Sequence, residues 1–338
     1  MFKDYLNKLV ALENISEEGA EECMNEIMSG NCTQSQISAF LVALKIKGET
    51  IEEITGCARA MKNKAEEFEL DGDYYIDTCG TGGDGGKTFN ISTCASIIAA
   101  SGGVKIAKHG NRAVSSKSGS SDVLSKLGVP ISLDTEASKL CLKENNMTFL
   151  FAPDYHKAMK YAAPVRGELG MRTIFNILGP LTNPAPIKGQ VMGVYSEKLT
   201  ESMAKVLLKL GRERALVVNG DGLDEITIAG KTKVSELKNG KILNYYIDPR
   251  EFGLIMASVE EMAGGNSEEN AAIIVDILKG KKGPKRDVVL INAAAALYVG
   301  KKVENLSDGI EYARTLIDSG IALDKLNQLC GFERSAVH

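Results

Sequence analysis

Residues 74–93 combine three local patterns: a short apolar run at 74–77, a loop crowded with glycine at 80–86, and a helix opened by polar residues. Glycine tolerates positive φ, and because it has no side chain it lets main-chain N–H groups come close to a ligand. The first turn of a helix adds unpaired N–H donors and the positive end of the helix dipole. A strand, a glycine loop and a helix start in this order predict a site for phosphate oxygens.

Two standard nucleotide-binding motifs do not fit this loop. A Walker loop needs a glycine, four further residues and then Gly-Lys-Ser/Thr. Residues 86–88 supply that end, but Thr81 stands where the first glycine belongs. The spacing G-x-G-x-x-G does occur at 80–85, yet a dinucleotide site also needs an acid about twenty residues later to hold the ribose. After Asp84 the next acid is Asp122, so we predict an anion site of another kind.

The composition bounds the class of protein. A chain of 338 residues suffices for one large or two ordinary domains, and 44% hydrophobic with 25% charged residues is ordinary for a soluble protein. No apolar run approaches the ~20 residues that span a bilayer, and the first residues carry no signal-peptide core. The seven cysteines include no C-x-x-C pair and favour reduced thiols. We therefore expect a cytoplasmic protein.

Charge and histidine content argue against two kinds of site. The formal net charge is −4 and the pI is near 5.7, whereas a nucleic-acid partner requires a basic face. The chain has only three histidines, one of them the last residue. A histidine-rich metal site is therefore excluded.

The first 65 residues predict a helical module. Ser16 precedes two acids and an apolar stripe at helical spacing. Thr33 with Gln36, and Thr50 with Glu53, have the spacing of capping boxes. We expect this module to serve in packing or dimer formation rather than in catalysis.

From residue 73 onward, short apolar runs alternate with helical stretches such as 91–101 and 199–210. This alternation predicts βα units and a mostly parallel sheet. We therefore expect an α/β fold with a helical domain at 1–72 and an α/β domain at 73–338. The expected strands are 74–77, 104–107, 148–151, 191–194, 215–218 and 288–291.

Polar clusters follow three of these expected strands. The glycine loop, the segment 108–112 and the pair Asp224-Glu225 each come shortly after a strand. Ligands of parallel sheets bind beyond the carboxyl ends of the strands. We therefore expect the three clusters to converge on one crevice.

The segment 108–121 is a second candidate for anion binding. It carries the cations Lys108, Arg112 and Lys117, five serines and no acid, which suits phosphate. Taken alone, it is equally well explained as a flexible, solvated basic loop. The glycine loop beside it favours the binding role.

Asp224 and Glu225 are candidate ligands for Mg²⁺, which is commonly held by one or two carboxylates together with substrate phosphates. Ser92, at the predicted helix start, could add a hydroxyl. Taken alone, a turn with exposed acids is the commoner explanation. The case for a metal depends on the phosphate site.

Arg166 could clamp a carboxylate through two parallel hydrogen bonds, although a surface salt bridge with Glu168 is the commoner role for such an arginine. His109 and His156 could act as acid–base groups, but a lone histidine is more often structural. Lys108 directly before His109 also makes that imidazole hard to charge. No Ser/His/Asp or Cys/His set is evident.

Four blocks together resemble the anthranilate phosphoribosyltransferase family, and they run in the family's order across nearly the whole chain. The blocks are 80–84 with 88–93, 108–112 with 118–120, 164–166 with 172–184, and 221–225. The resemblance implies that the amine of anthranilate displaces pyrophosphate from C1 of 5-phosphoribosyl pyrophosphate, in tryptophan biosynthesis and with Mg²⁺ as cofactor, two ions per subunit. It also implies the fold of the pyrimidine nucleoside phosphorylases, a second piece of the helical domain near 161–183, and a homodimer formed through that domain.

The resemblance also assigns site residues. It implies that Lys108 and Asp84 are catalytic and that Mg²⁺ is bound by Ser92, Asp224 and Glu225. It places anthranilate at Gly80, Asn111 and Arg166. The residues that it implies for phosphoribosyl pyrophosphate are Gly80, Gly83, Asp84, Thr88, Asn90, Ile91, Ser92, Thr93, Lys108, His109, Gly110, Asn111, Arg112, Ala113, Val114, Ser115, Ser116 and Ser120.

Two other functions remain open on the same fold. A pyrimidine nucleoside phosphorylase would use phosphate as its nucleophile, but it gives no reason for the block at 172–184. A non-catalytic nucleic-acid-binding relative would need a basic groove and would bind DNA in a salt-sensitive way. The acidic pI opposes that alternative.

Overall fold

The structure is a computed structural model that describes residues 1–82, 86–113 and 118–335, with the backbone alone for 333–335. Its amino-terminal part is a bundle of four helices: α1 (Phe2–Val10), α2 (Glu17–Met28), α3 (Gln34–Lys47) and α4 (Ile51–Asn63). The expected cap at Ser16 is present, and both expected capping boxes are confirmed. Local signals therefore set where α2, α3 and α4 begin.

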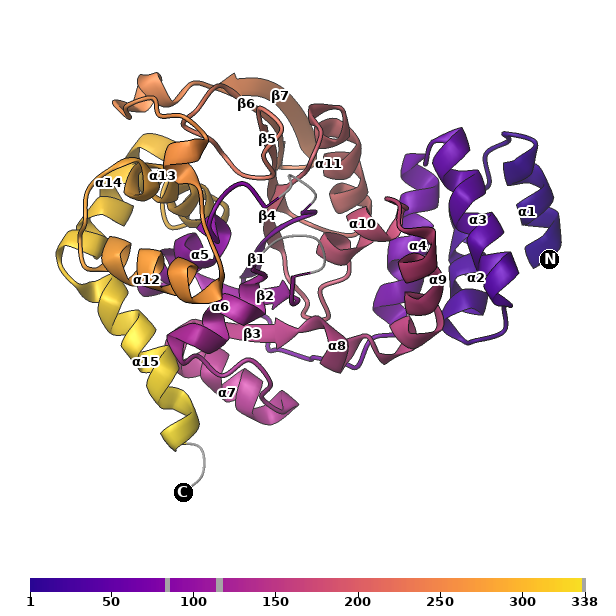
Figure 1. Ribbon diagram of the computed structural model, residues 1–338, viewed down its shortest axis with the longest axis horizontal. Coiled ribbons are helices and arrows are strands. Elements are labelled where there is room, and N and C mark those ends of the chain that lie inside the picture. Colours follow the sequence, from indigo (N-terminus) through magenta and orange to yellow (C-terminus); the bar gives the residue numbers. More distant parts are fainter. Residues whose placement is uncertain (83–85, 114–117, 336–338) are drawn as a thin grey trace.

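A second group of short helices packs against this bundle, although it lies much later in the chain. It comprises η1 (Lys157–Tyr161), α9 (Ala163–Leu169), α10 (Phe175–Leu178) and η2 (Gly179–Leu181). Val165 and Phe175 belong to the same apolar core as Leu41 and Leu44 of α3. Figure 1 shows α9 and α10 beside α3 and α4.

The rest of the chain is organised on one seven-stranded sheet with the order β3-β2-β1-β4-β5-β6-β7. The first five strands in this order are parallel, and five of the six expected strands are confirmed. β6 and β7 pair antiparallel at one edge and were not expected. The strand bounds are β1 (Tyr75–Gly80), β2 (Lys105–Gly110), β3 (Met147–Phe151), β4 (Gly189–Gly193), β5 (Arg214–Gly220), β6 (Thr232–Lys238) and β7 (Lys241–Ile247).

The sixth expected strand, 288–291, was wrong. These residues lie in helix α13 (Pro284–Val299), whose side chains from Val288 onward are all buried. α13 packs between α5 (Ile91–Ser101) and α14 (Leu306–Asp318), so it is apolar on every side and shows no helical period. A short apolar run fits a buried strand and a buried helix equally well.

Helices cover both faces of the sheet. On β5, Leu216 points into a core shared with α5, α13, α14 and α15 (Ile321–Ser335), whereas Val217 points into the core of α11 (Thr200–Lys209) and the helical bundle. The expected helices at 91–101 and 199–210 are thus confirmed as α5 and α11. The other helical segments are α6 (Ser120–Leu127), α7 (Thr135–Asn145), α8 (Ala152–Tyr155), η3 (Glu197–Leu199), η4 (Pro249–Phe252), η5 (Glu260–Met262) and α12 (Ser267–Leu278).

The carboxyl edge of the parallel strands faces the helical bundle. β3 runs directly into α8, and the chain continues through η1 to α9 (Figure 1). The ends of β1, β2 and β5 therefore come together near the junction of the two parts. Among the described residues, no helix is both long enough and apolar enough to cross a membrane.

Candidate active site

The glycine loop and the acid pair meet at the carboxyl edge of the sheet, as expected. The N–H of Gly82 donates to Asp224 Oδ2 at 2.7 Å. A Cβ added to Gly80 would overlap that same carboxylate, and a Cβ added to Gly193, the last residue of β4, would overlap the Asp224 main chain. Asp224 can therefore reach the loop only because Gly80 and Gly193 have no side chains.

The second carboxylate of the pair lies at the start of α5. Glu225 Oε1 accepts a hydrogen bond from the N–H of Ser92 at 3.1 Å. An acid is favoured there because the helix amino terminus carries unpaired N–H donors and a partial positive charge. The structure thus brings together Ser92, Asp224 and Glu225, the three residues proposed for Mg²⁺.

These oxygens suit Mg²⁺, which prefers hard oxygen ligands and is usually held by one or two carboxylates plus phosphate oxygens. Within the described residues, no group of three or more His, Cys, Asp and Glu side chains could hold a metal ion. A site of two carboxylates with a phosphorylated substrate fits this donor set better than a cage made by the protein alone.

Two asparagines hold the acid pair in place. Asn292 of α13 accepts from the N–H of Ile226 at 3.1 Å and donates to the carbonyl of Ile226 at 2.8 Å. Asn219 at the end of β5 donates to the carbonyls of Val194 and Leu223 at 2.6 and 3.3 Å. Asn292 was missed because its helix was expected to be a strand. A lone polar residue in an apolar run was the signal that could have found it.

Lys108 lies beneath the end of β1. Its side chain is only 2% exposed, and its Nζ donates to the carbonyl of Thr78 at 2.5 Å and to the Thr78 hydroxyl at 3.3 Å. Burial lowers the pKa of Lys108, and the charges of Asp77, Cys79 and Glu225 act in the opposite direction. The charge of Glu225, one member of the acid pair, thus favours the protonated amine of Lys108.

Asp77 ties β1 to the neighbouring segments and was not expected to belong to the site. It is fully buried, and burial raises its pKa while the Lys108 charge opposes that rise. It accepts hydrogen bonds from Asn183 Nδ2 at 2.8 Å and from the N–H of His109 at 3.3 Å. Asn183 lies where the chain returns from the second group of short helices to the sheet.

His109 and His156 are neutral at physiological pH. Burial lowers the pKa of His109 to about 3, with a further contribution from His156, and burial lowers the pKa of His156 to about 4. Their ring centroids lie 5.1 Å apart. The expectation that His109 resists charging is confirmed, but the causes are burial and the second imidazole rather than Lys108. Neither ring can serve as a cationic acid.

Asp122 of α6 accepts hydrogen bonds from two main-chain N–H groups in the segment between β2 and α6. The N–H groups of Ala113 and Gly119 both donate to Asp122 Oδ2, at 3.0 and 2.9 Å. A Cβ added to Gly110 would overlap the Ser120 hydroxyl. Asp122 was missed as a functional residue, although an acid three residues into a helix is a capping signal.

Other predicted substrate residues lie around these segments. The guanidinium of Arg112 lies 5.9 Å from the centroid of the Phe151 ring, and the Asn111 side chain accepts from the Arg112 N–H at 2.7 Å. Ile91 and Thr93 are buried in α5, whereas Thr88 is partly exposed. Gly83, Asp84, Val114, Ser115 and Ser116 lie outside the described residues.

Arg166 is on α9, in the second group of short helices. Its guanidinium lies 5.1 Å from the Phe175 ring centroid, and burial lowers its pKa. Among the described residues it forms no ion pair, so the surface salt bridge with Glu168 is absent. No described contact brings it to Gly80 or Asn111.

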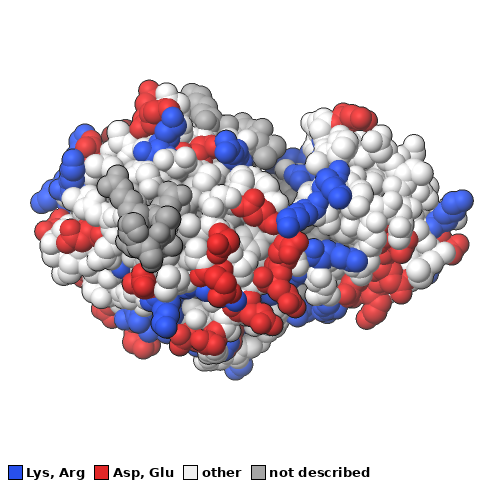
Figure 2. All heavy atoms as spheres, turned by 90° about the horizontal axis from the view of Figure 1, so that it is seen from below, with Lys and Arg blue, Asp and Glu red and all other residues white. Residues whose placement is uncertain are grey.

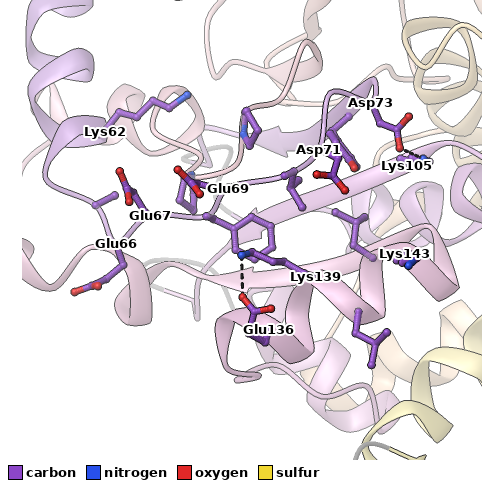
Figure 3. A pocket seen from close by; sticks show the side chains of 18 of the residues that line it. Lys62, Glu66, Glu67, Glu69, Asp71, Asp73, Lys105, Glu136, Lys139 and Lys143 are labelled. Atoms are coloured by element: carbon purple, nitrogen blue, oxygen red, sulfur yellow. Dashed lines mark hydrogen bonds and ion pairs between the residues drawn. The ribbon is translucent and has the colours of Figure 1, made fainter.

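A hollow of about 1170 Å³ is lined by the linker 65–73, by the end of α4, by α7, and by Tyr75 and Lys105 at the amino ends of β1 and β2. Figure 3 shows its mixed lining, with Lys105 paired to Asp73 and Lys139 paired to Glu136. Figure 2 likewise shows acidic and basic side chains interspersed over one face of the molecule. None of the predicted site residues lines this hollow, so it is separate from the candidate site.

Known proteins resemble this chain over its full length. The sequence model described as "Glycosyl transferase family, a/b domain" matches residues 72–323, and the helical bundle domain of the same family matches residues 3–65. The anthranilate phosphoribosyltransferase of Thermoanaerobacter sp. (strain X514) is 58% identical over 335 residues, which cover 99% of each chain.

Solved structures agree with the sequence relatives. The crystal structure of anthranilate phosphoribosyltransferase from Thermus thermophilus has a TM-score of 0.93 and 42% identity, covering 98% of this chain and 99% of that one. The Saccharomyces cerevisiae enzyme of the same name, in complex with PRPP and Mg, has a TM-score of 0.89 and 30% identity, covering 99% and 98%. The chain therefore belongs to the anthranilate phosphoribosyltransferase family.

Proposed function

We propose that this chain transfers the 5-phosphoribosyl group of 5-phosphoribosyl pyrophosphate to the amine of anthranilate, releasing pyrophosphate, as a Mg²⁺-dependent pentosyltransferase of tryptophan biosynthesis. The observation that carries the proposal is the meeting of the Gly80–Gly82 turn and the start of α5 with the Asp224-Glu225 pair. Full-length relatives at 51–58% identity and a yeast relative in complex with PRPP and Mg support it.

The chemistry matches the residues present. An aromatic amine is neutral at pH 7, so its lone pair needs no strong base to attack C1 of the ribose. The C1–N bond forms as the C1–O bond breaks, the C1–O electron pair leaves with pyrophosphate, and the nitrogen passes a proton to water or to the released pyrophosphate. Charge grows on the leaving oxygens while the sugar becomes oxocarbenium-like, so the protein must position the reactants and stabilise charge. The neutral His109 and His156 are consistent with a site that does without a strong acid.

The roles that the family resemblance implies for the residues meet these needs. Main-chain N–H groups of the glycine turn and of α5 hold phosphate oxygens, and Lys108 and Asp84 are the catalytic residues. Asp224, Glu225 and the Ser92 hydroxyl would hold Mg²⁺, two ions per subunit. When bound, Mg²⁺ neutralises charge on the departing pyrophosphate.

Anthranilate binds at Gly80, Asn111 and Arg166, the last from the helical part. The two parts of the chain act as a helical domain at 1–72, joined by 161–183, and an α/β domain at 73–338. The shared apolar core of α3 and α9 supports that grouping. The enzyme forms a homodimer through the helical domain and works in the cytoplasm, with small molecules rather than nucleic acid or membrane as its ligands.

Replacing Arg166 with alanine tests the anthranilate subsite. A guanidinium that contacts a carboxylate contributes about 1.5–3 kcal/mol, so we expect the KM for anthranilate to rise at least about tenfold. The KM for phosphoribosyl pyrophosphate is expected to stay within about twofold. Steady-state kinetics with each substrate varied in turn measure both. Lys160→Ala removes an exposed cation of the same segment and serves as control; equal rises for both substrates in the Arg166 variant would make Arg166 structural.

The whole proposal is tested by mixing the protein with anthranilate, phosphoribosyl pyrophosphate and Mg²⁺ and following the loss of anthranilate fluorescence. Time-dependent loss that requires all three components supports it. Parallel assays measure phosphorolysis of thymidine and uridine and binding of DNA at low salt. Turnover of a nucleoside with no loss of anthranilate would replace the proposal by a phosphorylase, and DNA binding without turnover would replace it by a binding protein.

A further inference from the structure

Asn270 of α12 is a buried amide, 2% exposed, that lies outside every predicted site segment. Its Oδ1 accepts a hydrogen bond from the N–H of Gly265 at 2.8 Å, and its Nδ2 donates to Asn90 Oδ1 at 2.9 Å. Asn90 Nδ2 in turn donates to the carbonyl of Ser118 at 3.3 Å. These bonds join the turn before α12 to the starts of α5 and α6, two helices that begin at the candidate site (Figure 1).

The backbone groups of Gly265 and Ser118, at the two ends of this series of hydrogen bonds, determine the direction of each bond in it. A backbone N–H can only donate, so Gly265 holds the oxygen of the Asn270 amide and leaves its NH₂ group facing Asn90. Asn90 must then present its oxygen to Asn270, and its own NH₂ group points the other way. The Ser118 carbonyl, which can only accept, agrees with that orientation.

Asn90 does not perform the usual task of an asparagine at its position. It is the N-cap residue of α5, where an asparagine oxygen ordinarily accepts from an N–H of the first turn. Asn90 makes no such bond to the described first turn, and Glu225 bonds the N–H of Ser92 instead. Its oxygen is engaged by Asn270 and one hydrogen of its NH₂ group by the Ser118 carbonyl, which leaves the second N–H of that group as the donor it can offer to a ligand.

The turn beside Asn270 leaves the amide little room to move. A Cβ added to Gly264 would lie 2.6 Å from Asn270 Oδ1 and 2.6 Å from the Cα of Phe89, the residue before Asn90. The N–H of Phe89 also donates to the carbonyl of Met262 at 3.3 Å. The segment 262–265 therefore packs directly on the chain that leads into α5.

We propose that Asn270 is a positioning residue, which holds the Asn90 amide with its NH₂ group toward a phosphate oxygen of the phosphoribosyl substrate. This rests on the proposed function, in which Asn90 binds that substrate. A phosphate oxygen can only accept, so an Asn90 amide turned the other way would face it with an oxygen and repel it.

Asn270→Asp is the sharpest test, because the side chain keeps its shape while the NH₂ donor that faces Asn90 becomes an acceptor oxygen. One carboxylate oxygen still accepts from Gly265, and the other faces Asn90, whose amide must turn to donate to it. We expect the Kd and the KM for phosphoribosyl pyrophosphate, measured with Mg²⁺ by calorimetry and kinetics, to rise at least about tenfold. The KM for anthranilate is expected to change by less than about twofold.

A double-mutant cycle separates this role from a purely structural one. Asn90→Ala alone should weaken binding of phosphoribosyl pyrophosphate, and adding Asn270→Asp should then cost no more than about a further twofold, because the amide to be oriented is gone. Equal fold-changes in the two backgrounds would overturn the proposal. So would unchanged affinity in the single variant.

Controls guard against failure to fold. Asn145→Asp converts another buried asparagine, at the end of α7, and should leave both KM values unchanged. If Asn270→Asp does not fold, Asn270→Ala decides: a Kd raised at least about threefold supports the proposal, and an unchanged Kd overturns it. Wild-type protein that binds phosphoribosyl pyrophosphate but does not consume anthranilate would defeat the proposed function while leaving this binding test valid.

Discussion

Converting Asp224 to Asn and Glu225 to Gln together is expected to reduce Mg²⁺-dependent turnover by at least about 10²–10³, the cost of removing one preorganised electrostatic contact from an active site. The amides keep the size of the carboxylates. Their oxygens can still accept from the N–H groups of Gly82 and Ser92, which the carboxylates bond at 2.7 and 3.1 Å. The change therefore removes negative charge while leaving the loop in place.

Turnover at increasing Mg²⁺, together with calorimetric binding of Mg²⁺ in the presence of phosphoribosyl pyrophosphate, measures this effect. Asp221→Asn is the matched control, because Asp221 is an exposed acid of the same turn whose φ of 53° asparagine readily adopts. Wild-type turnover and an unchanged Mg²⁺ requirement in the double variant would show that the pair does not hold the metal.

Replacing Gly193 with alanine is expected to damage the same site through the backbone. The added Cβ would overlap the carbonyl group of Asp224, and Gly193 is fixed in the sheet by pairing with Gly80 and Val218. Asp224 must therefore move away from Gly82. We expect turnover to fall at least about 10²-fold and the free energy of unfolding to fall by about 1–3 kcal/mol, as for overpacked interiors.

Denaturant unfolding and initial rates measure the two effects separately. Gly230→Ala is the control, since its added Cβ would lie at an ordinary 3.5 Å from Asp221 Oδ2. A Gly193 variant with wild-type turnover would show that the close approach of Asp224 to β4 is not required. If Gly193→Ala lowers the free energy of unfolding but leaves turnover normal, Gly193 matters for packing and not for the site.

The sequence predicted correctly those helices whose first residues are fixed by capping interactions within one turn. Thr33 and Thr50 begin their helices as expected because each cap and its partner lie within one turn of chain. The glycine loop predicted an anion site because close approach of the main chain to a ligand needs residues without side chains, and that site remains a prediction. The order of strands and polar clusters was enough to predict that the glycine turn and the acid pair meet at the carboxyl edge.

Long-range packing decided the elements that the sequence misassigned or missed. Residues 288–291 were expected to be a strand because α13 is enclosed on all sides. Enclosure removes the polar face by which a helix is recognised in a sequence. β6 escaped notice partly because it carries Glu236, which is 7% exposed and accepts hydrogen bonds from the hydroxyls of Tyr245 and Tyr298 at 3.0 and 2.5 Å. A buried acid is tolerated only where such partners exist, and the partners lie on β7 and α13.

The sequence by itself determined the helical module, the glycine turn and the residues that resemble a phosphoribosyl-transfer site. Only the tertiary structure decided which groups support that site: Asp77 bonds Asn183, Asn292 bonds Ile226, and Asn270 bonds Asn90. Each of these pairs joins segments that are distant in the chain. Local propensity carries no information about such a contact, which arises only when the sheet and its covering helices bring the two side chains into one buried space.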